Sequence, residues 1–148
     1  MELETYDIKA WDKYSYTFYS EGPNGRIKKG INFQRMEEIG INVFNLAFGD
    51  VDESTGRIND LSISNNNDRL KILMTVAEAV IDFIQSVPNA IIIIKGSTLS
   101  RTRLYQMGIS SFWSEIKRHY NIYGNLDNKW LPFQKGVNYE RFLLFKKN

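Results

Sequence analysis

Two stretches near the start of the chain alternate apolar or aromatic residues with polar ones. They cover residues 12–20, DKYSYTFYS, and residues 26–36, RIKKGINFQRM, and the segment EGPNG lies between them. A period of two is the pattern of a β-strand with one buried face, and a Pro-Asn-Gly turn between two such runs indicates a hairpin. We therefore predict a β-hairpin over residues 12–36.

A second pair of alternating stretches follows at residues 41–51 and 56–64, joined by the segment DESTG. Gly56 is able to supply the positive φ that this turn needs. The pair predicts a second hairpin. The residues that connect the two hairpins, FQRMEEIG at 33–40, either form one turn of helix that ends at Gly40 or form a loop.

The hydrophobic period changes after residue 68, where a long amphipathic stretch begins. Its apolar residues recur at helical spacing, and Asn67 and Asp68 precede it with side chains suited to an N-cap. Pro88 and Asn89 end the stretch, so we predict a long helix over residues 69–87. Its inward-facing residues are expected to be Leu73, Val76, Ala77, Val80, Ile84 and Val87.

A continuous apolar run, AIIIIK at residues 90–95, follows the helix. Such a run is typical of a strand covered on both faces, so we expect it to be central in the sheet. Two shorter helices are predicted next, one over residues 97–107 that Gly108 closes, and one over residues 110–120. Near the C-terminus NIYG, KWLPF and YERFLLFKK predict two or three strands, with Pro132 at an edge or a strand end.

These elements together indicate the α+β class. We predict a single domain over residues 1–148, with a mostly antiparallel sheet of six to seven strands, a long central helix, and one or two shorter helices packed on it. A chain of this length suits one domain with a substantial core. No internal repeat, low-complexity segment or linker interrupts the pattern.

Four segments of the chain carry a resemblance to a known family: FYSEGPNGRIKK, NLAFGDVDESTGRINDLSISNNND, IIIIKGSTLSRTRLYQMGI and PFQKGVNYERFLL. Over nearly its whole length the chain resembles a family of small bacterial proteins classified only as a domain of unknown function. The resemblance implies a bacterial, soluble, single-domain protein. It brings no established activity, substrate or catalytic residue.

Composition removes several classes of site. Zero cysteines exclude disulfides, thiolate nucleophiles and thiolate-bound metals, and the single histidine, His119, is too few for a histidine-rich cluster. Only an all-carboxylate site for a hard cation remains possible, and we expect no metal and no cofactor. No apolar run approaches the roughly 20 residues that span a bilayer, and the start MELETYDIKAWDKY lacks the pattern of a signal peptide. A cytoplasmic location without a membrane partner is the expectation.

The formal charge is distributed unevenly along the chain. Residues 1–94 hold 9 Lys and Arg against 14 Asp and Glu, a charge of −5, whereas residues 95–148 hold 10 against 3, a charge of +7. Such asymmetry is typical of a surface that meets nucleic acid or an acidic partner. The alternative is that the two halves interleave in space and their fields cancel, because exposed charges are screened within about 10 Å.

The segment KGSTLSRTR at residues 95–103 is the strongest candidate site in the sequence. A glycine turn between a strand and a helix N-terminus is where open sheets bind anions, because free N–H groups and the helix dipole favour negative charge there. We expect Arg101 to lie beside Lys95, and Arg103 to meet carboxylates of the N-terminal half. The candidate ligand-binding residues are Lys95, Gly96, Ser97, Thr98, Ser100 and Arg101.

This segment is neither a Walker A loop nor a dinucleotide-binding loop, because its glycines differ in number and spacing from both. The alternative to an anion site is structural: Ser97 or Ser100 caps the helix, Gly96 makes the turn, and the arginines form a solvated face. Capping accounts for the hydroxyl groups, but not for three cations near the positive end of a helix dipole.

A second resemblance concerns the order of the elements. Antiparallel strands, a long helix, a strand and then SRTRLYQMGI are similar to the acyl-CoA-dependent N-acetyltransferase core, in which a helix with an aliphatic-tyrosine-x-x-glycine pattern follows the fifth strand. Leu104, Tyr105 and Gly108 match that pattern. That family's pyrophosphate loop is glycine-rich and precedes the long helix, whereas SISNNNDRL stands at this place here.

Two acidic residues and the histidine allow both a functional and a structural interpretation. Asp50 and Asp52 share one strand face and suit a hard cation, as in ribonuclease-H-like nucleases, but DESTG is also typical of a hairpin turn, and we expect the turn. His119 follows two cations at a helix end, where we expect it to cap the helix rather than act as a base.

Aromatic residues occur on both faces of the first predicted hairpin. One face must be core, and the other, if it is exposed beside Lys28 and Lys29, suits stacking on single-stranded nucleic acid or binding to a protein. The aromatic residues are Trp11, Tyr14, Tyr16, Phe18 and Tyr19.

The leading hypothesis from the sequence is a non-enzymatic module that binds an anionic partner, nucleic acid or acidic protein, through the basic C-terminal third and the segment 95–103. The competing hypothesis is an enzyme that uses a phosphorylated cofactor or substrate, with acyl-CoA-dependent acetyl transfer as its most concrete form. The sequence does not determine the oligomeric state.

Overall fold

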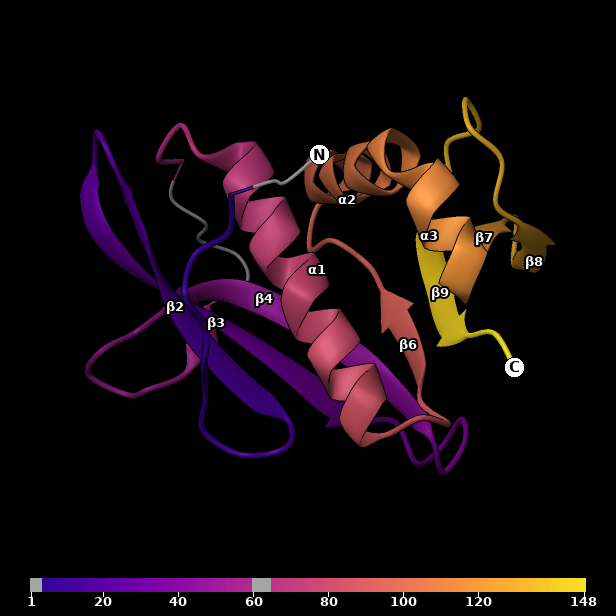
Figure 1. Cartoon of the computed structure of the whole chain (residues 1–148), viewed down its shortest axis with the longest axis horizontal. Helices are drawn as coiled ribbons and strands as arrows, with labels where there is room; N and C mark the ends of the chain where they lie inside the picture. Colours follow the sequence, from indigo (N-terminus) through magenta and orange to yellow (C-terminus); the bar gives the residue numbers. More distant parts are fainter. Residues whose placement is uncertain (1–3, 60–64) are drawn as a thin grey trace. The chain divides into compact units, whose positions relative to one another are not determined.

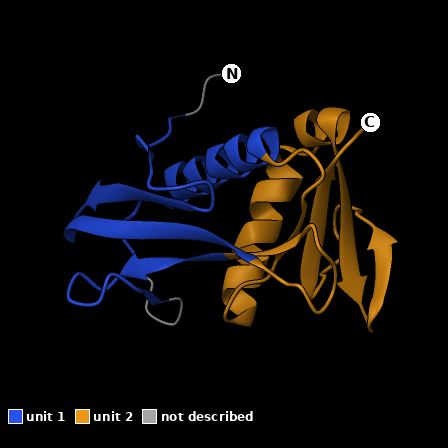
Figure 2. Cartoon of the chain, turned by 90° about the horizontal axis from the view of Figure 1, so that it is seen from below, with its two compact units in different colours: residues 1–34, 47–86 blue, residues 35–46, 87–148 orange. Residues whose placement is uncertain are grey.

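The chain forms two units, and neither is continuous in sequence (Figure 2). The computed structural model describes residues 4–59 and 65–148. Unit 1 comprises Met1–Gln34 and Ala47–Ser86, and unit 2 comprises Arg35–Leu46 and Val87–Asn148. Strand β4 (Val43–Val51) therefore starts in unit 2 and ends in unit 1. That residues 1–148 fold as one domain stays a prediction.

Unit 1 contains the first hairpin that the sequence predicts, and the structure confirms it. Strands β2 (Ser15–Gly22) and β3 (Gly25–Arg35) pair antiparallel up to Gly22 and Gly25, where Gly25 has a φ of 84°. Strand β1 (Lys9–Ala10) pairs antiparallel with β2. The hydrogen-bonded order is β1-β2-β3-β4, and Figure 1 labels β2, β3 and β4.

The second predicted hairpin is also present in unit 1. Strand β5 (Ile58–Asn59) pairs antiparallel with the end of β4, and Gly56 has the expected positive φ, 72°. The predicted continuation over residues 60–64 lies outside the described residues. In unit 2 the connection that follows β3 is a turn rather than a helix, in which the Met36 carbonyl accepts hydrogen bonds from Ile39 and Gly40 N–H.

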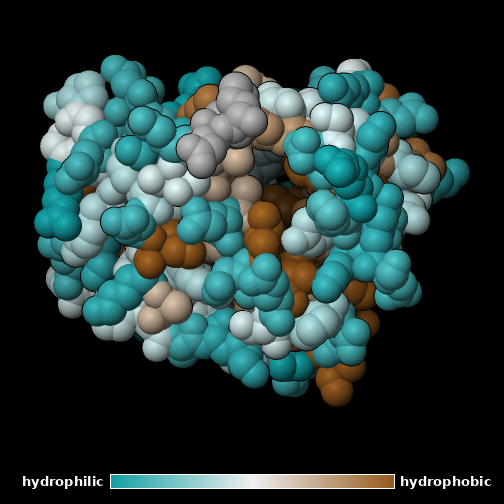
Figure 3. Space-filling model, in the orientation of Figure 1, coloured by the Kyte–Doolittle hydropathy of each residue, from teal (hydrophilic) through white to brown (hydrophobic). Residues whose placement is uncertain are grey.

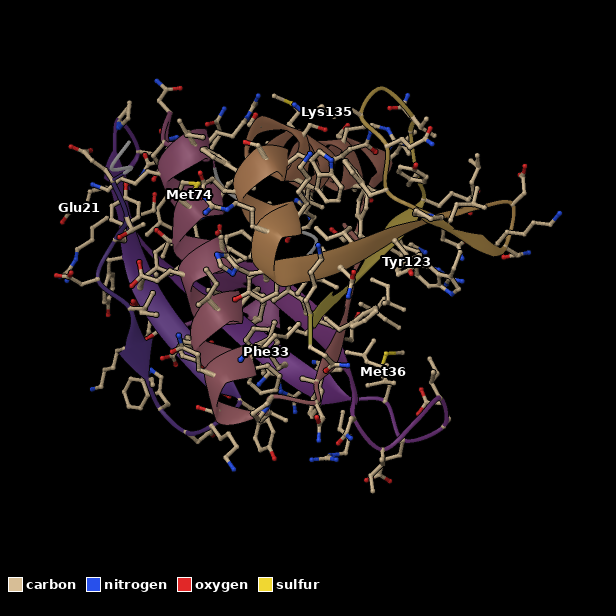
Figure 4. All side chains as sticks on the ribbon, turned by 45° about the vertical axis from the view of Figure 1, so that its right-hand side comes forward. Glu21, Phe33, Met36, Met74, Tyr123 and Lys135 are labelled. Atoms are coloured by element: carbon tan, nitrogen blue, oxygen red, sulfur yellow. The ribbon has the colours of Figure 1, made fainter. Side chains whose placement is uncertain are left out.

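Helix α1 (Arg69–Ser86) packs on the interior face of β2 and β3. Phe83 of α1 stacks on Phe33 of β3 with ring centroids 4.2 Å apart and planes 1° from parallel (Phe33 is labelled in Figure 4). The Tyr16 hydroxyl of β2 donates a hydrogen bond to Asp82 of α1 at 2.7 Å. Burial, and then this carboxylate, raise the pKa of Tyr16. The long predicted helix is therefore anchored to the first hairpin.

The inward face of α1 differs in part from the predicted one. Val76, Val80 and Ile84 are buried as expected, but the other predicted core positions of the helix are only half-buried. In each turn of α1, the buried positions begin one residue before the predicted ones. The reason is that Phe83 packs on Phe33, which turns the side of the helix that carries Phe83 toward the core. The buried residues are Ile72, Thr75, Val76, Ala79, Val80, Phe83 and Ile84.

The strands of unit 2 are hydrogen-bonded in the order β4-β6-β9-β7-β8. β6 pairs in parallel with β4, and the other neighbours are antiparallel. β6 is therefore central, as predicted, although Ile91 and Ile93 are only half-buried. Pro132 ends the edge strand β8, also as predicted. The bounds are β6 (Ile91–Ile94), β7 (Tyr120–Leu126), β8 (Lys129–Pro132) and β9 (Arg141–Lys146).

Two helices follow β6 in unit 2, α2 (Leu99–Ser111) and α3 (Trp113–His119). The prediction that Gly108 closes the first of them is wrong, because α2 continues to Ser111 and Phe112 is its C-cap. Trp113 of α3 packs on Phe133 at 4.8 Å between centroids, and Phe133 in turn lies 6.2 Å from Phe142 of β9. This aromatic cluster forms the core of unit 2 between the helices and the sheet.

The described residues contain nine strands and three helices. The α+β class and the mostly antiparallel sheet are confirmed. The predicted count of six to seven strands was too low, and β1, which was not predicted, has two residues and is too short to show a period.

Candidate functional site

The turn after β6 is held by contacts with the first turn of α2. Gly96 is buried, and its N–H donates to the Thr102 hydroxyl at 3.1 Å. A Cβ at Gly96 would lie 2.3 Å from the Thr102 nitrogen. Glycine is therefore required here by the close approach of the helix, and its N–H is used inside the protein.

Thr98 is the N-cap of α2. Its φ of −131° and ψ of 163° are those of an N-cap residue, and its hydroxyl accepts a hydrogen bond from Arg101 N–H at 3.3 Å. The structural alternative named Ser97 or Ser100 as the cap, and both were wrong. Ser100 and Lys95 are exposed. The guanidinium of Arg101 donates to the Ser97 hydroxyl.

Among residues 4–59 and 65–148, Arg103 meets no carboxylate of the N-terminal half, contrary to the prediction. Its guanidinium donates to the Tyr139 carbonyl at 2.7 Å and to the Gln106 side-chain oxygen at 2.9 Å. The same Gln106 oxygen accepts from Tyr139 N–H at 3.1 Å. Arg103 therefore connects α2 to the segment before β9, which leaves Lys95 and Arg101 as the cations of the turn. Their convergence on one point stays a prediction.

A row of three polar and aromatic side chains crosses unit 2's sheet, and the sequence analysis did not single it out. Asn125 of β7 is the register partner of Trp130 on β8 and of Arg141 on β9, so the three share one face. The Arg141 guanidinium lies over the Trp130 ring, 5.4 Å from its centroid. Asn125 is 1% exposed, whereas Trp130 is 38% exposed. We call these residues the Asn125 row.

Buried polar atoms of the Asn125 row lack partners. Within residues 4–59 and 65–148, neither the side-chain nitrogen nor the oxygen of Asn125 has a hydrogen bond, and neither does Arg141 Nε. Most buried polar groups are hydrogen-bonded, since an unpaired one costs about 1–3 kcal/mol. The sequence carried one signal for this row: the Asp127-Asn128 turn, with φ of 52° and 62°, is typical of a two-residue hairpin and sets Asn125 opposite Trp130.

The outer face of unit 1's hairpin is aromatic and basic, partly as expected. Trp11 is 56% exposed, with Lys9 Nζ 4.0 Å and Lys28 Nζ 5.7 Å from its ring centroid. The Arg26 guanidinium lies over the Tyr19 ring, 3.9 Å from the ring centroid. Lys29, expected on this face, points instead into the core of unit 1, because consecutive residues of a strand face opposite sides.

The carboxylates of the second hairpin have structural partners. Asp50 pairs with the buried Lys29. Asp52 accepts hydrogen bonds from the Ser54 hydroxyl and the Ser54 N–H, and these hold the pKa of Asp52 below its ordinary value. The turn that we expected is therefore present. No group of three or more metal-binding side chains occurs within the described residues.

The two units carry opposite formal charges. Unit 2 holds 11 Lys and Arg against 5 Asp and Glu, a charge of +6, and unit 1 holds 8 against 12, a charge of −4. All of residues 95–148 belong to unit 2. The asymmetry along the sequence is therefore also an asymmetry between structural units.

The comparison with known families covers almost the whole chain. A family model described as a family of unknown function, DUF6934, matches residues 2–147. The chain belongs to the DUF6934 family. This confirms the resemblance to a domain of unknown function. No curated protein and no solved structure matches this DUF6934 chain. None of its helices, over the residues that the structure describes, is long and apolar enough to cross a bilayer.

Proposed function

We propose that the protein binds a polyanion through unit 2, and that this polyanion is single-stranded nucleic acid. The observation that carries the proposal is the charge of +6 on unit 2. Clustered cations attract phosphates by a sequence-independent electrostatic term that supplies most of the non-specific affinity for nucleic acid. On the face drawn in Figure 3, hydrophobic residues appear as separate patches within a largely hydrophilic surface.

Nucleic acid fits unit 2 better than an acidic protein does, because aromatic side chains accompany its cations. Trp130 is exposed beside Arg141, and Tyr123 stacks on Phe145 on the same face of the sheet. Proteins that bind single strands combine a basic surface with rings on which bases stack. An acidic protein offers carboxylates to the cations, whereas a single strand offers phosphates to the cations and, in every nucleotide, a base to the rings.

Within this proposal, the turn after β6 contacts one phosphate. Lys95 and Ser100 are exposed, and Arg101 lies in the first turn of α2, where the helix dipole also favours an anion. The hydroxyls of Ser97 and Thr98 are bonded to Arg101 and to the first turn of α2. Gly96 provides the turn rather than a hydrogen bond to the ligand.

The test is a fluorescence anisotropy titration of labelled DNA and RNA single strands over a series of salt concentrations. The affinity should fall with salt at a log-log slope of about −0.7 per phosphate contact. The double variant Lys95→Ala/Arg101→Ala should bind more weakly, and the slope should become shallower by about 0.7, because one phosphate contact is lost. Lys13→Ala, an exposed cation of unit 1, is the matched control and should leave both unchanged.

Two results would contradict the proposal. One is the absence of binding to any single strand at low salt. The other is equal affinity for polyglutamate at the same salt concentration, which would assign the basic surface to an acidic protein.

A second candidate function is acyl-CoA-dependent transfer, and the order of elements favours it. Antiparallel β2, β3 and β4 precede the long α1, and β6 leads directly into α2 with Leu104, Tyr105 and Gly108. Against it, Asp68 lies at the start of α1, where a carboxylate would repel a pyrophosphate. Thermal-shift measurements with acetyl-CoA, CoA, ATP and NAD decide, since a ligand at 100 times its dissociation constant adds about 2.7 kcal/mol to the free energy of unfolding.

A further inference from the structure

We infer that the Asn125 row is a nucleobase-binding site, which takes one unpaired base of a single-stranded nucleic acid. The inference rests on the proposed function and adds the place and the manner of base recognition. It starts from the three buried atoms without partners, the side-chain nitrogen and oxygen of Asn125 and Nε of Arg141. Together they offer two donors and one acceptor on a single face of the sheet.

The amide of Asn125 is complementary to the edge of a base. An asparagine side chain presents an adjacent donor and acceptor, and adenine offers a matching acceptor and donor at N7 and N6. A base with this edge turned toward Asn125 satisfies both amide atoms at once. Arg141 Nε supplies a further donor beside them.

Trp130 provides the stacking surface next to this amide. It is the direct register partner of Asn125, and it is 38% exposed on the edge strand β8. Stacking of a base on an aromatic ring contributes about 1–3 kcal/mol and does not depend strongly on which base is present. The Asn125 row thus combines stacking on Trp130, which accepts any base, with hydrogen bonds to the Asn125 amide, which select among bases.

Arg141 covers the site in the free protein and is held there weakly. Its guanidinium lies over Trp130, and within residues 4–59 and 65–148 its Nε has no hydrogen bond. A cation–π contact such as that with Trp130 is worth about 0.5–2 kcal/mol. When a base enters the Asn125 row, the Arg141 guanidinium moves away from Trp130 to a phosphate of the strand. This movement uncovers the ring of Trp130 and the amide of Asn125.

The occupant is a single strand rather than a duplex. In a duplex both faces of each base are stacked on its neighbours, so that no base is open to stack on the Trp130 ring, even though the N7 and N6 edge of adenine is accessible in the major groove. The charge of +6 on unit 2 complements the phosphates that flank an unpaired base.

The experiment measures anisotropy of labelled homopolymer strands of about 12 nucleotides, a matching duplex, and free AMP as a competitor. Trp130→Ala should weaken single-strand binding about 5- to 100-fold, and Trp130→Phe should retain most of it. Asn125→Leu should reduce the preference among the four bases and leave the salt slope unchanged. Leu131→Ala, an exposed apolar residue that follows Trp130 on β8 and points to the opposite face of the sheet, is the matched control and should change affinity less than about twofold.

A purely structural role predicts a different pattern, since the Trp130 and Asn125 variants would then alter thermal stability without altering base preference. The site is refuted if Trp130→Ala binds every strand as the wild type does while Lys95→Ala/Arg101→Ala still loses affinity, and in that case the proposed function survives. If no strand binds to the wild-type protein, both fail together. If AMP binds as tightly as the adenine strand, the occupant is a free nucleotide and the single-strand assignment is overturned.

Discussion

Lys29 and Asp50 form an ion pair in the interior of unit 1, where the lysine side chain is fully buried and the carboxylate is 16% exposed. The strand registers explain how they meet. Lys29 is the register partner of Phe18, and Phe18 stacks on Phe48, which precedes Asp50 by two residues on β4. Both charges are therefore on the same face of the sheet as the aromatic core.

Breaking this pair should destabilise the protein strongly. Asp50→Asn leaves the buried ammonium without its counter-charge, and we expect a loss of about 3–5 kcal/mol in the free energy of unfolding. The double variant Lys29→Met/Asp50→Leu should lose much less than the sum of the single variants Lys29→Met and Asp50→Leu, because no uncompensated charge remains. Urea unfolding of the four proteins measures this coupling. Additive losses would show that the two side chains act independently.

Gly124 on β7 should not tolerate a side chain. A Cβ there would lie 2.2 Å from ring atoms of Tyr139, which is almost fully buried and donates its hydroxyl proton to the Pro132 carbonyl. Gly124→Ala should therefore cost at least about 2 kcal/mol through overpacking. Gly40→Ala, whose Cβ would lie 3.1 Å from a Val43 methyl group, is the milder comparison. Equal thermal shifts for the two variants would contradict this account.

In the turn after β6, Thr98 contributes to stability as the N-cap of α2, whereas the exposed Ser100 is a candidate for binding only. Thr98→Ala should cost about 1 kcal/mol, because the hydroxyl that accepts from Arg101 N–H is lost, and Thr98→Ser should retain most of that stability. Ser100→Ala should change the free energy of unfolding by less than about 0.5 kcal/mol, since Ser100 is exposed. Chemical unfolding of the three variants tests this order, and a larger loss for Ser100→Ala than for Thr98→Ala would reverse the assignment of the cap.

Alkaline pH should weaken the folded state through Tyr16. Burial and the Asp82 carboxylate raise its pKa in the folded protein above the ordinary value of about 10. A group with a raised folded pKa contributes stability below its unfolded pKa and loses it as pH rises toward the folded one. The free energy of unfolding should thus fall above about pH 10, and fall less steeply in Tyr16→Phe. Tyr19→Phe, on the opposite face of β2, controls for the loss of a tyrosine hydroxyl.

Elements whose hydrophobic residues recur with a clear period were predictable from the sequence. Contacts between residues far apart in the sequence were not. The β2–β3 hairpin and α1 follow from spacing alone. Arg103, by contrast, bonds to the carbonyl of Tyr139, far away in the sequence, and no local pattern marks a carbonyl as a partner. The choice of Thr98 over its serine neighbours depends on one residue's backbone angles, which composition does not reveal.

The Asn125 row shows the same limit for the candidate site. Each of its residues looks ordinary within its own strand, and only the pairing of three strands brings them onto one face. The Asn125 amide has no hydrogen-bond partner among the described residues, and the Arg141 guanidinium on the same face lies over Trp130. A sequence pattern reports which face a residue occupies, but not whether its polar atoms find partners.

Because β4 is divided between the two units, the order in which the ribosome releases the chain determines when each part of this strand finds its pairing partner. All of unit 1 has been synthesised once Ser86 is made, whereas the early segment Arg35–Leu46 belongs to unit 2 and precedes the rest of that unit. Val43–Leu46 therefore has no β6 to pair with until Ile91–Ile94 emerges. An unpaired strand edge of this kind attracts other chains, so the growing polypeptide is most exposed to misassembly while the long helix is being made.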